Sequence, residues 1–374
     1  MTAVEMFTTY SNNLKNLPKS MKLIEDRADY QVFEDEIFKV FRSENCNYVF
    51  DKITGTMELF GRTREENPGR FPAPNILDME VTTICSGVKN KVCPFCYKAN
   101  TPNGTYMTFD TFKKIFDKLP KSITQIAFGA DATLTSNPDL WKMMEYAREN
   151  GVIPNVTAAE LSDDVADNLR KHCGAVAISV YHDKDVAYDS IKKLTDRGMN
   201  QVNIHCMISE ETYDRALMIL EDRLSDERLS KLNAIVFLSL KKKGRGTGFH
   251  PLSQEKFNNI VKIAHENNIG IGFDSCSSYK ALVAYDKIGI DVSKYIIPCE
   301  AAMQSSYINV NGEYFPCSFC EDEDIFKKGI DVVNCEDFIE DVWNAESTLE
   351  FANKLEDTCS GNCMGCRSCP VFEV

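Results

Sequence analysis

The sequence lacks any apolar run long enough to span a membrane, and its first residues lack the charged and then apolar pattern of a secretion signal. We therefore expect a cytoplasmic protein that is not embedded in a membrane. The chain also has fewer basic than acidic residues: 42 Lys and Arg and 56 Asp and Glu give a net charge of −14. This balance argues against a surface for bulk nucleic-acid or anionic-membrane binding, since both partners are negatively charged.

Cysteine, in contrast, is abundant, with 15 residues in 374. A reducing compartment disfavours disulfides, so metal binding is the better explanation. Three cysteines lie within 85–96 and eight lie between 299 and 369. The scattered remainder is expected to serve as small buried apolar residues: Cys46, Cys173, Cys206 and Cys276.

From residue 76 onward, short apolar segments alternate with amphipathic ones. The expected strands are 76–82, 125–128, 153–157, 175–180, 201–207, 234–240 and 269–273. The expected helices are 108–119, 138–150, 162–173, 185–197, 210–223 and 253–267, and Asn137 and Pro138 are expected to cap and open the second of them. Repeated strand–helix units predict a parallel α/β fold, either a barrel or a doubly wound sheet. In a barrel, the active site lies at the carboxyl ends of the strands.

The flanking segments have a different character. Residues 20–42 have helical spacing with many charges, and residues 48–60 have the pattern of a β-hairpin around a Gly turn. Further along, an Asn-Gly turn at 311–312 predicts a second hairpin, in a segment too small to fold without a metal. We expect an N-terminal extension over 1–75, a β/α barrel over 76–295 and a Cys-rich domain over 296–374.

The first cysteine group follows the first expected barrel strand. Cys85 is separated by seven residues from Cys93, and Cys96 follows three positions later. Three thiolates on one loop can hold three irons of a cubane and leave the fourth iron open. A structural zinc site wants four ligands, usually from two CxxC-type pairs. The spacing favours the iron–sulfur cluster and leaves zinc as the alternative.

This loop resembles that of the radical S-adenosylmethionine (SAM) superfamily, whose usual pattern is CxxxCxΦC with an aromatic residue at Φ. Phe95 stands at Φ, whereas the first gap has seven residues rather than three. The resemblance covers roughly 76–280 and implies a partial (β/α)6-type TIM barrel. It also implies a [4Fe–4S] cluster on Cys85, Cys93 and Cys96, with SAM bound at the open iron.

The resemblance also implies which residues bind SAM. In the family, a GGEP-type motif after the second strand binds the SAM amino group, and here Gly129 and Asp131 match it, with Asp in place of Glu. Ser179 matches the position that contacts the ribose, and Phe95 and the main chain near Leu238 would border the adenine. The alternative for Asp131 is a loop-capping role, and for Ser179 it is a locally satisfied hydroxyl.

Other polar residues are expected at the same end of the barrel. The basic segment 241–246 follows the sixth strand and is expected either to meet a substrate carboxylate or phosphate or to form a solvated turn. Residues 274–276 end the seventh strand and are expected to point toward the site. His205 is expected to be a satisfied core histidine.

The C-terminal cysteines resemble the auxiliary-cluster domains of radical SAM enzymes, called twitch and SPASM. Cys299 and Cys317 match their CxnGx4C element, and the resemblance implies one auxiliary [4Fe–4S] cluster. Its candidate ligands are Cys299 and Cys317 with two of Cys363, Cys366 and Cys369, while Cys320, Cys335 and Cys359 are spare. A zinc site with four cysteine ligands is the alternative.

The resemblance implies an oxidoreductase that cleaves SAM reductively to methionine and a 5′-deoxyadenosyl radical, which abstracts hydrogen from a substrate carbon. No catalytic side chain is assigned beyond the cluster. Oxidative modification of a peptide or protein is expected, and a small metabolite or nucleotide-like substrate is the alternative. An electron donor such as flavodoxin or ferredoxin is also implied. A zinc-stabilised β/α binding protein and an iron–sulfur electron carrier are the other possible functions.

Overall fold

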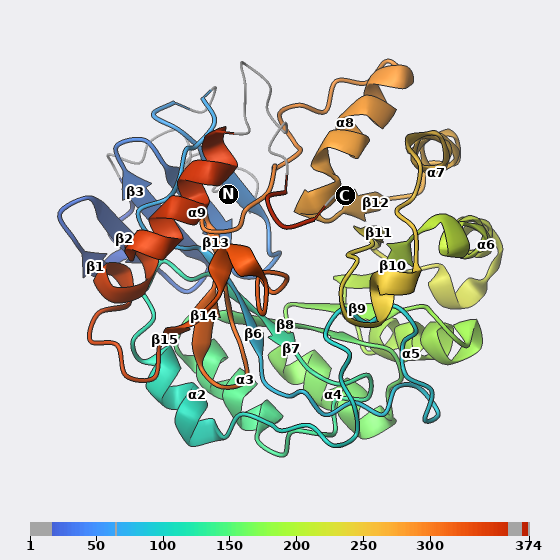
Figure 1. The fold of residues 1–374 in the computed structure, drawn as a ribbon, viewed down its shortest axis with the longest axis horizontal. Helices are drawn as coiled ribbons and strands as arrows, with labels where there is room; N and C mark the ends of the chain where they lie inside the picture. The colour runs from blue at the N-terminus through green and yellow to red at the C-terminus, as the bar shows by residue number, and fades with distance from the viewer. Residues whose placement is uncertain (1–16, 64–65, 358–368, 373–374) are drawn as a thin grey trace.

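The structure is a computed structural model, and it describes residues 17–63, 66–357 and 369–372. At its centre, seven parallel strands follow one another in chain order within a ten-stranded sheet. They are β6 (Ile76–Glu80), β7 (Gln125–Gly129), β8 (Ile153–Ala158), β9 (Ala175–Ser179), β10 (Val202–Ile208), β11 (Ala234–Ser239) and β12 (Ile271–Phe273). The helices form an outer row around them (Figure 1): α2 (Phe109–Phe116), α3 (Leu140–Glu149), α4 (Asp163–His172), α5 (Lys184–Asp196), α6 (Tyr213–Ser225), α7 (Gln254–Glu266) and α8 (Ser278–Lys287). The predicted alternation is confirmed.

The sequence of β10 explains why the barrel is hollow. Val202, Ile204, Cys206 and Ile208 are buried, whereas the alternate residues Asn203, His205 and Met207 are partly exposed. Successive side chains of a strand point to opposite faces, so one set packs outward and the other lines the interior. These three partly exposed residues all border an internal cavity.

The sheet does not close into a full barrel. β12 forms one edge, and at the other side β13 (Ser305–Ile308) pairs in parallel with β6. The antiparallel strands β14 (Glu313–Phe315) and β15 (Ile330–Asp331) extend the sheet beyond it. The prediction of a partial barrel is confirmed, with seven strands in the series rather than six, and the predicted hairpin around 311–312 joins β13 to β14.

The N-terminal segment is a five-stranded antiparallel meander. Its strands are β1 (Lys22–Asp26), β2 (Tyr30–Glu34), β3 (Phe38–Ser43), β4 (Asn47–Asp51) and β5 (Met57–Phe60). The hairpin prediction for 48–60 is confirmed by the β4–β5 pair. The helical interpretation of 20–42 is wrong. Charged residues in the turns between three short strands produced a spacing that resembles a helical period.

Buried polar contacts fix this sheet against the end of the barrel opposite the site. On β3, the Lys39 ammonium donates to the carbonyl oxygen of Ile123 at 2.7 Å. On β4, the Tyr48 hydroxyl donates to the carbonyl oxygen of Ser122. Both acceptors precede β7, so the meander and the barrel share one continuous core.

The last helix, α9 (Glu346–Asp357), lies in the same half of the molecule as the N-terminal sheet (Figure 1). Arg27, which follows β1, forms an ion pair with Asp337 at 2.9 Å, just before a π-helical turn at Ile339–Trp343. The 3-10 turns lie at Glu210–Thr212, Glu227–Leu229, Gly244–Gly248, Ser275–Ser277 and Asp324–Phe326. None of the described helices combines the length and the apolar character that crossing a membrane requires.

One local prediction is wrong. Helix α3 begins at Leu140 with Asp139 at its N-cap, so Asn137 and Pro138 precede the helix instead of opening it. The Asn137 amide donates to the carbonyl oxygens of Val81 at 2.8 Å and Met107 at 3.0 Å. Asn137 therefore ties the chain after β7 to the chain after β6.

Candidate active site

A cavity of about 500 Å³ occupies the barrel interior and opens at the carboxyl ends of the strands. Small residues leave this space, notably Ala127, Ala175 and Ala177. Polar groups at its wall include Asp78, Asn155 and His205. The cavity is large enough to bury a small-molecule ligand, and its position is that of a barrel active site.

The cysteine loop covers the mouth of this cavity. Cys85, Cys93 and Cys96 are free, partly exposed thiols, and the last two line the cavity. The Gly87 amide donates to the Cys85 sulfur at 3.4 Å. Burial raises the pKa of the Cys93 thiol to about 12. A thiolate at this position therefore requires a compensating positive charge, which a metal centre provides.

All three cysteines lie within electrostatic reach of one tyrosine, Tyr181. Burial is the main cause that raises the pKa of Tyr181, and the charges of Cys93, Cys85 and Cys96 raise it further. Within the described ranges, no three His, Cys, Asp or Glu side chains are grouped to hold a metal ion. A cubane distributes its ligands over several irons and holds them farther apart than one zinc ion does. Three thiols on one loop fit such a centre.

The basic segment 241–246 holds the cysteine loop in place. The Arg245 guanidinium donates from Nε to the Cys93 carbonyl oxygen at 2.8 Å and from Nη1 to that of Asn100 at 3.1 Å. Its backbone amide donates to the Cys96 carbonyl oxygen at 3.0 Å. Gly244 has φ +55°, and a Cβ there would lie 2.3 Å from the Tyr97 carbonyl oxygen. The segment is therefore neither a solvated turn nor a free substrate loop.

The predicted SAM-binding residues all border the cavity: Phe95, Gly129, Asp131, Ser179 and Leu238. The Phe95 ring packs edge-on against Tyr181, with centroids 6.2 Å apart, and against Phe249 at 5.9 Å. Ser179 ends β9, and its hydroxyl has no hydrogen-bond partner in the part of the chain that the structure describes. Its hydroxyl therefore remains available to a ligand.

Asp131 is held within its own loop. One carboxylate oxygen accepts from the Thr133 hydroxyl at 2.7 Å, and the other accepts from the Ser136 hydroxyl at 2.7 Å. The amides of Thr133, Thr135 and Ser136 donate to the same carboxylate at 3.1, 3.1 and 3.0 Å. Burial opposes its ionisation, but these hydrogen bonds outweigh burial and hold its pKa below the usual value. This geometry favours the loop-capping alternative, and contact with the SAM amino group stays a prediction.

Arg215 was missed by the sequence analysis. It lies in the first turn of α6, with its guanidinium carbon 5.9 Å from the Phe95 ring centroid. Its Nη1 is buried without a hydrogen-bond partner among the described residues. A buried, unpaired guanidinium nitrogen is costly, and an anionic ligand would satisfy it. The SAM carboxylate and an iron–sulfur cluster with cysteine ligands are both such groups.

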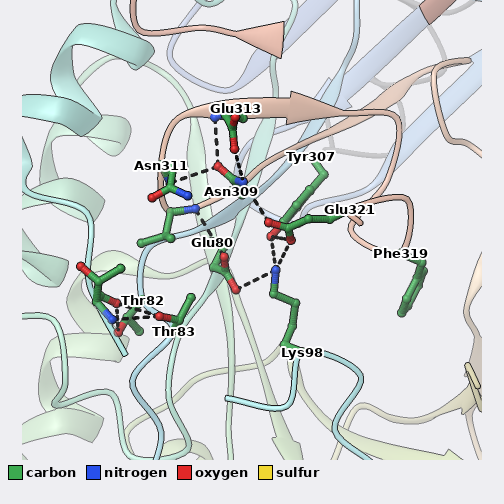
Figure 2. Close-up of polar contacts among 12 residues, drawn as sticks. Glu80, Thr82, Thr83, Lys98, Tyr307, Asn309, Asn311, Glu313, Phe319 and Glu321 are labelled. Atoms are coloured by element: carbon green, nitrogen blue, oxygen red, sulfur yellow. Dashed lines mark hydrogen bonds and ion pairs between the residues drawn. The ribbon is translucent and has the colours of Figure 1, made fainter. Parts of the chain in front are cut away.

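A buried charge network joins the cysteine loop to the barrel and to the C-terminal hairpin (Figure 2). The Lys98 ammonium lies 3.2 Å from a Glu80 carboxylate oxygen, pairs with Glu321 and donates to the Tyr307 hydroxyl at 2.9 Å. The Asn309 amide donates to the second Glu321 oxygen at 2.9 Å. Burial raises the pKa of Glu80, and the Lys98 charge opposes that rise. The network fixes the cysteine loop relative to β6 and β13.

Comparison with known proteins gives the same fold. No family model and no curated protein matches the chain. The structure of Streptococcus suis SuiB bound to precursor peptide SuiA matches with a TM-score of 0.59 and 14% identity, over 74% of this chain and 66% of SuiB. SuiB bound to S-adenosylmethionine matches with a TM-score of 0.56 and 13% identity, over the same shares. This chain therefore spans about two thirds of the SuiB chain. The chain shares its fold, a partial TIM barrel, with SuiB.

The predictions for His205 and for residues 274–276 have different outcomes. His205 lines the cavity, with its Nδ1 3.2 Å from the Thr157 hydroxyl. Burial lowers its pKa to about 4, so the imidazole is neutral at pH 7. Residues 274–276 do not line the cavity. They lie beside Lys241, whose ammonium is 3.1 Å from Asp274 and whose side chain is only 2% exposed.

The C-terminal cysteines are described only in part. Cys359, Cys363 and Cys366 fall outside the described residues, so their assignment stays a prediction. The charges of Cys317 and Cys369 act on the Cys299 thiol and raise its pKa, in addition to the larger effect of burial. The Cys317 and Cys320 sulfurs are 3.4 Å apart. Cys335 lies elsewhere, since its thiol donates to the Val332 carbonyl oxygen at 3.3 Å and has Lys118 and three aspartates as charged neighbours.

Proposed function

We propose that the chain is a radical SAM enzyme that carries out an oxidative modification of a peptide. One observation carries the proposal: Cys85, Cys93 and Cys96 share a loop over the mouth of a cavity, within a fold that SAM-bound SuiB also has. The SuiB structure with a precursor peptide supports a peptide substrate. When bound, the cluster and SAM supply reductive cleavage to methionine and a 5′-deoxyadenosyl radical that takes hydrogen from a substrate carbon.

The residues around the cavity have separate tasks in this proposal. Cys85, Cys93 and Cys96 would hold the cluster, and the unpaired Nη1 of Arg215 would face negative charge. Phe95 and Leu238 offer apolar surface to an adenine, and the free hydroxyl of Ser179 offers a hydrogen bond to a ribose. The neutral imidazole of His205 adds no charge to the cavity.

The Lys98 and Arg245 contacts would keep the cysteine loop closed over the reacting centre. Arg245 binds a backbone carbonyl oxygen of the loop, and Lys98, which lies on the loop, binds the carboxylates of Glu80 and Glu321. Each contact joins the loop to a segment far away in the chain. A rigid loop excludes water, which preserves a reactive radical and fixes the substrate carbon relative to the cofactor.

The test is SAM-dependent release of 5′-deoxyadenosine from anaerobically reconstituted protein reduced with dithionite. Dithionite replaces the proposed flavodoxin or ferredoxin donor. We expect release from the unchanged chain and none from Cys96→Ala, because the cluster then lacks a ligand. Cys335→Ala is the matched control and should retain release, since that thiol lies away from the loop. Equal release from Cys96→Ala would overturn the cluster assignment.

Two alternatives give different results in the same preparation. A zinc-stabilised binding protein would be colourless and contain no iron. An electron carrier would contain iron but release no 5′-deoxyadenosine. Substrate class is tested by adding peptides or small metabolites to the reduced enzyme in deuterated water. The class that raises 5′-deoxyadenosine formation above the rate without substrate is the one accepted, so stimulation by metabolites alone would exclude the peptide proposal.

A further inference from the structure

Cys276 stands in surroundings that its sequence position does not predict. It lies in the 3-10 turn Ser275–Ser277 directly after β12, 23 residues before Cys299. An isolated cysteine of this kind is expected to be a small apolar residue in the core. The residue as a whole is partly exposed, and the charged groups that act on its thiol are Lys241, Asp274, Cys299 and Cys369.

Packing contacts independent of the thiols bring these segments together. The Ser278 hydroxyl donates to the Ile297 carbonyl oxygen at 2.6 Å, which joins the turn after β12 to the segment that carries Cys299. The Phe319 and Phe372 rings lie 6.5 Å apart, which joins the Cys317 loop to the Cys369 segment. In agreement, the described C-terminal residues end beside β12 (Figure 1).

Lys241 connects the turn after β12 to the loop that carries Cys317. Its ammonium lies 3.1 Å from Asp274, contacts the Cys276 thiol, and stands 5.0 Å from the centroid of the Phe319 ring. It therefore holds the turn after β12 against the Cys317 loop.

The thiols then form a set around Cys299. Its electrostatic neighbours include Cys317 and Cys369, and Cys276 has Cys299 and Cys369 among its own. Thiolates within electrostatic reach of one another repel, and a metal centre removes that repulsion. The described part of the chain contains no group of three ligands tight enough for a single ion. A cubane spreads its four thiolates over several irons and therefore accepts ligands that are farther apart than those of one ion.

We propose that Cys276 is a ligand of an auxiliary [4Fe–4S] cluster, with Cys299, Cys317 and Cys369 as the other three. This assignment rests on the proposed function for the presence of such a cluster. It makes Cys363 and Cys366 unnecessary for this centre. It also places the cluster directly beyond β12, next to the barrel.

The experiment counts iron in a background without the first cluster. Cys85, Cys93 and Cys96 are changed to Ala in the full chain, and the protein is reconstituted anaerobically. Iron and sulfide per chain are measured, together with the electron paramagnetic resonance spectrum after dithionite reduction. Adding Cys276→Ala should remove about four irons per chain, or convert the spectrum to that of a three-iron cluster. Adding Cys335→Ala should change neither quantity.

Four further measurements complete the test. Circular dichroism melting of each variant shows whether it folds, and Cys276→Ser keeps the side-chain size while weakening ligation. In the chain with Cys85, Cys93 and Cys96 intact, Cys276→Ala should also lower the iron content by the same amount relative to Cys335→Ala. Cys363→Ala combined with Cys366→Ala should leave the auxiliary signal unchanged.

The proposal is overturned if Cys276→Ala retains full iron and an unchanged spectrum, or if the background variant binds no iron at all. It is also overturned if the Cys363 and Cys366 double variant loses the signal while Cys276→Ala keeps it. None of these readouts requires SAM cleavage. Failure of 5′-deoxyadenosine release would therefore count against the proposed function without affecting the iron count.

Discussion

Arg245 donates from its guanidinium Nε to the carbonyl oxygen of Cys93 at 2.8 Å, across 152 positions of the chain. The same side chain donates to the Asn100 carbonyl oxygen at 3.1 Å, so one residue spans the second half of the cysteine loop. Hydrogen bonds from a charged donor contribute about 1.5–3 kcal/mol each. The conformation of the loop therefore depends on a residue that follows β11 and binds no metal itself.

The first prediction concerns this contact. Arg245→Ala removes both side-chain hydrogen bonds, so the reconstituted chain should lose iron to a chelator roughly tenfold faster. The measurement is the bleaching of the cluster absorbance under anaerobic conditions. Lys242→Ala is the matched control, because Lys242 is an exposed residue of the same segment, and it should bleach at the original rate. Equal rates for the two variants would contradict the clamping role.

The second prediction concerns the charge network. Lys98→Met leaves the carboxylates of Glu80 and Glu321 without their cation, and their side chains are only 5% and 17% exposed. We expect a loss of about 3 kcal/mol in the free energy of unfolding, measured by urea denaturation of the metal-free protein. The exposed Lys171–Glu145 pair provides the comparison, and Lys171→Met should cost less than about 1 kcal/mol.

A double variant separates charge from packing in that network. Glu80→Gln removes one of the two unpaired carboxylates, so its combination with Lys98→Met should be more stable than Lys98→Met alone. If the two changes simply add, Glu80 and Lys98 do not interact energetically and the network has no stabilising role.

The barrel could be predicted from the sequence because its signals are local. Apolar segments and amphipathic segments recur at regular spacing from 76 to 273, and each predicted strand and helix overlaps one in the structure. The N-terminal sheet could not be predicted in this way, because β1, β2 and β3 are short and their turns are rich in charge. Asn137 was misassigned because its partners, Val81 and Met107, belong to another loop.

The site was predictable only where its residues are neighbours in the chain. Cys85, Cys93 and Cys96 form a spacing that can be read directly. Arg215 and Arg245 act on that loop from later β/α units, and Cys276 meets Cys299 and Cys369 only in the folded chain. A signal was present for Arg245, since its segment ends a parallel strand and so lies at the same end of the barrel as the cysteine loop.

The third prediction concerns the turn between β13 and β14. Gly312 has φ +82°, and a Cβ there would lie 2.5 Å from Cγ2 of Val333 and 3.1 Å from Cδ1 of Ile115. Gly312→Ala should therefore lower the free energy of unfolding by about 2 kcal/mol, through backbone strain and the close contact. Gly248→Ala is the matched control, because a Cβ there meets nothing within 4 Å. Equal urea midpoints for the two variants would contradict this account.

The fourth prediction follows from Lys39, which is 1% exposed beneath the N-terminal sheet. Burial lowers its pKa from 10.5 to about 8, although Glu34 opposes the shift. Between these two values the unfolded chain binds more protons at this site than the folded chain does. The free energy of unfolding should therefore rise with pH across that window, by about 3 kcal/mol from this group.

Lys39→Met isolates this contribution, because every other titrating group is common to both proteins. Urea denaturation of each at pH 8, 9 and 10 should show the unchanged chain gaining stability relative to the variant as pH rises. Lys231→Met, at an exposed lysine, should follow the unchanged chain instead. Parallel curves for the unchanged chain and Lys39→Met would mean that Lys39 keeps its ordinary pKa. In that case its ammonium would not be buried where the N-terminal sheet meets the barrel.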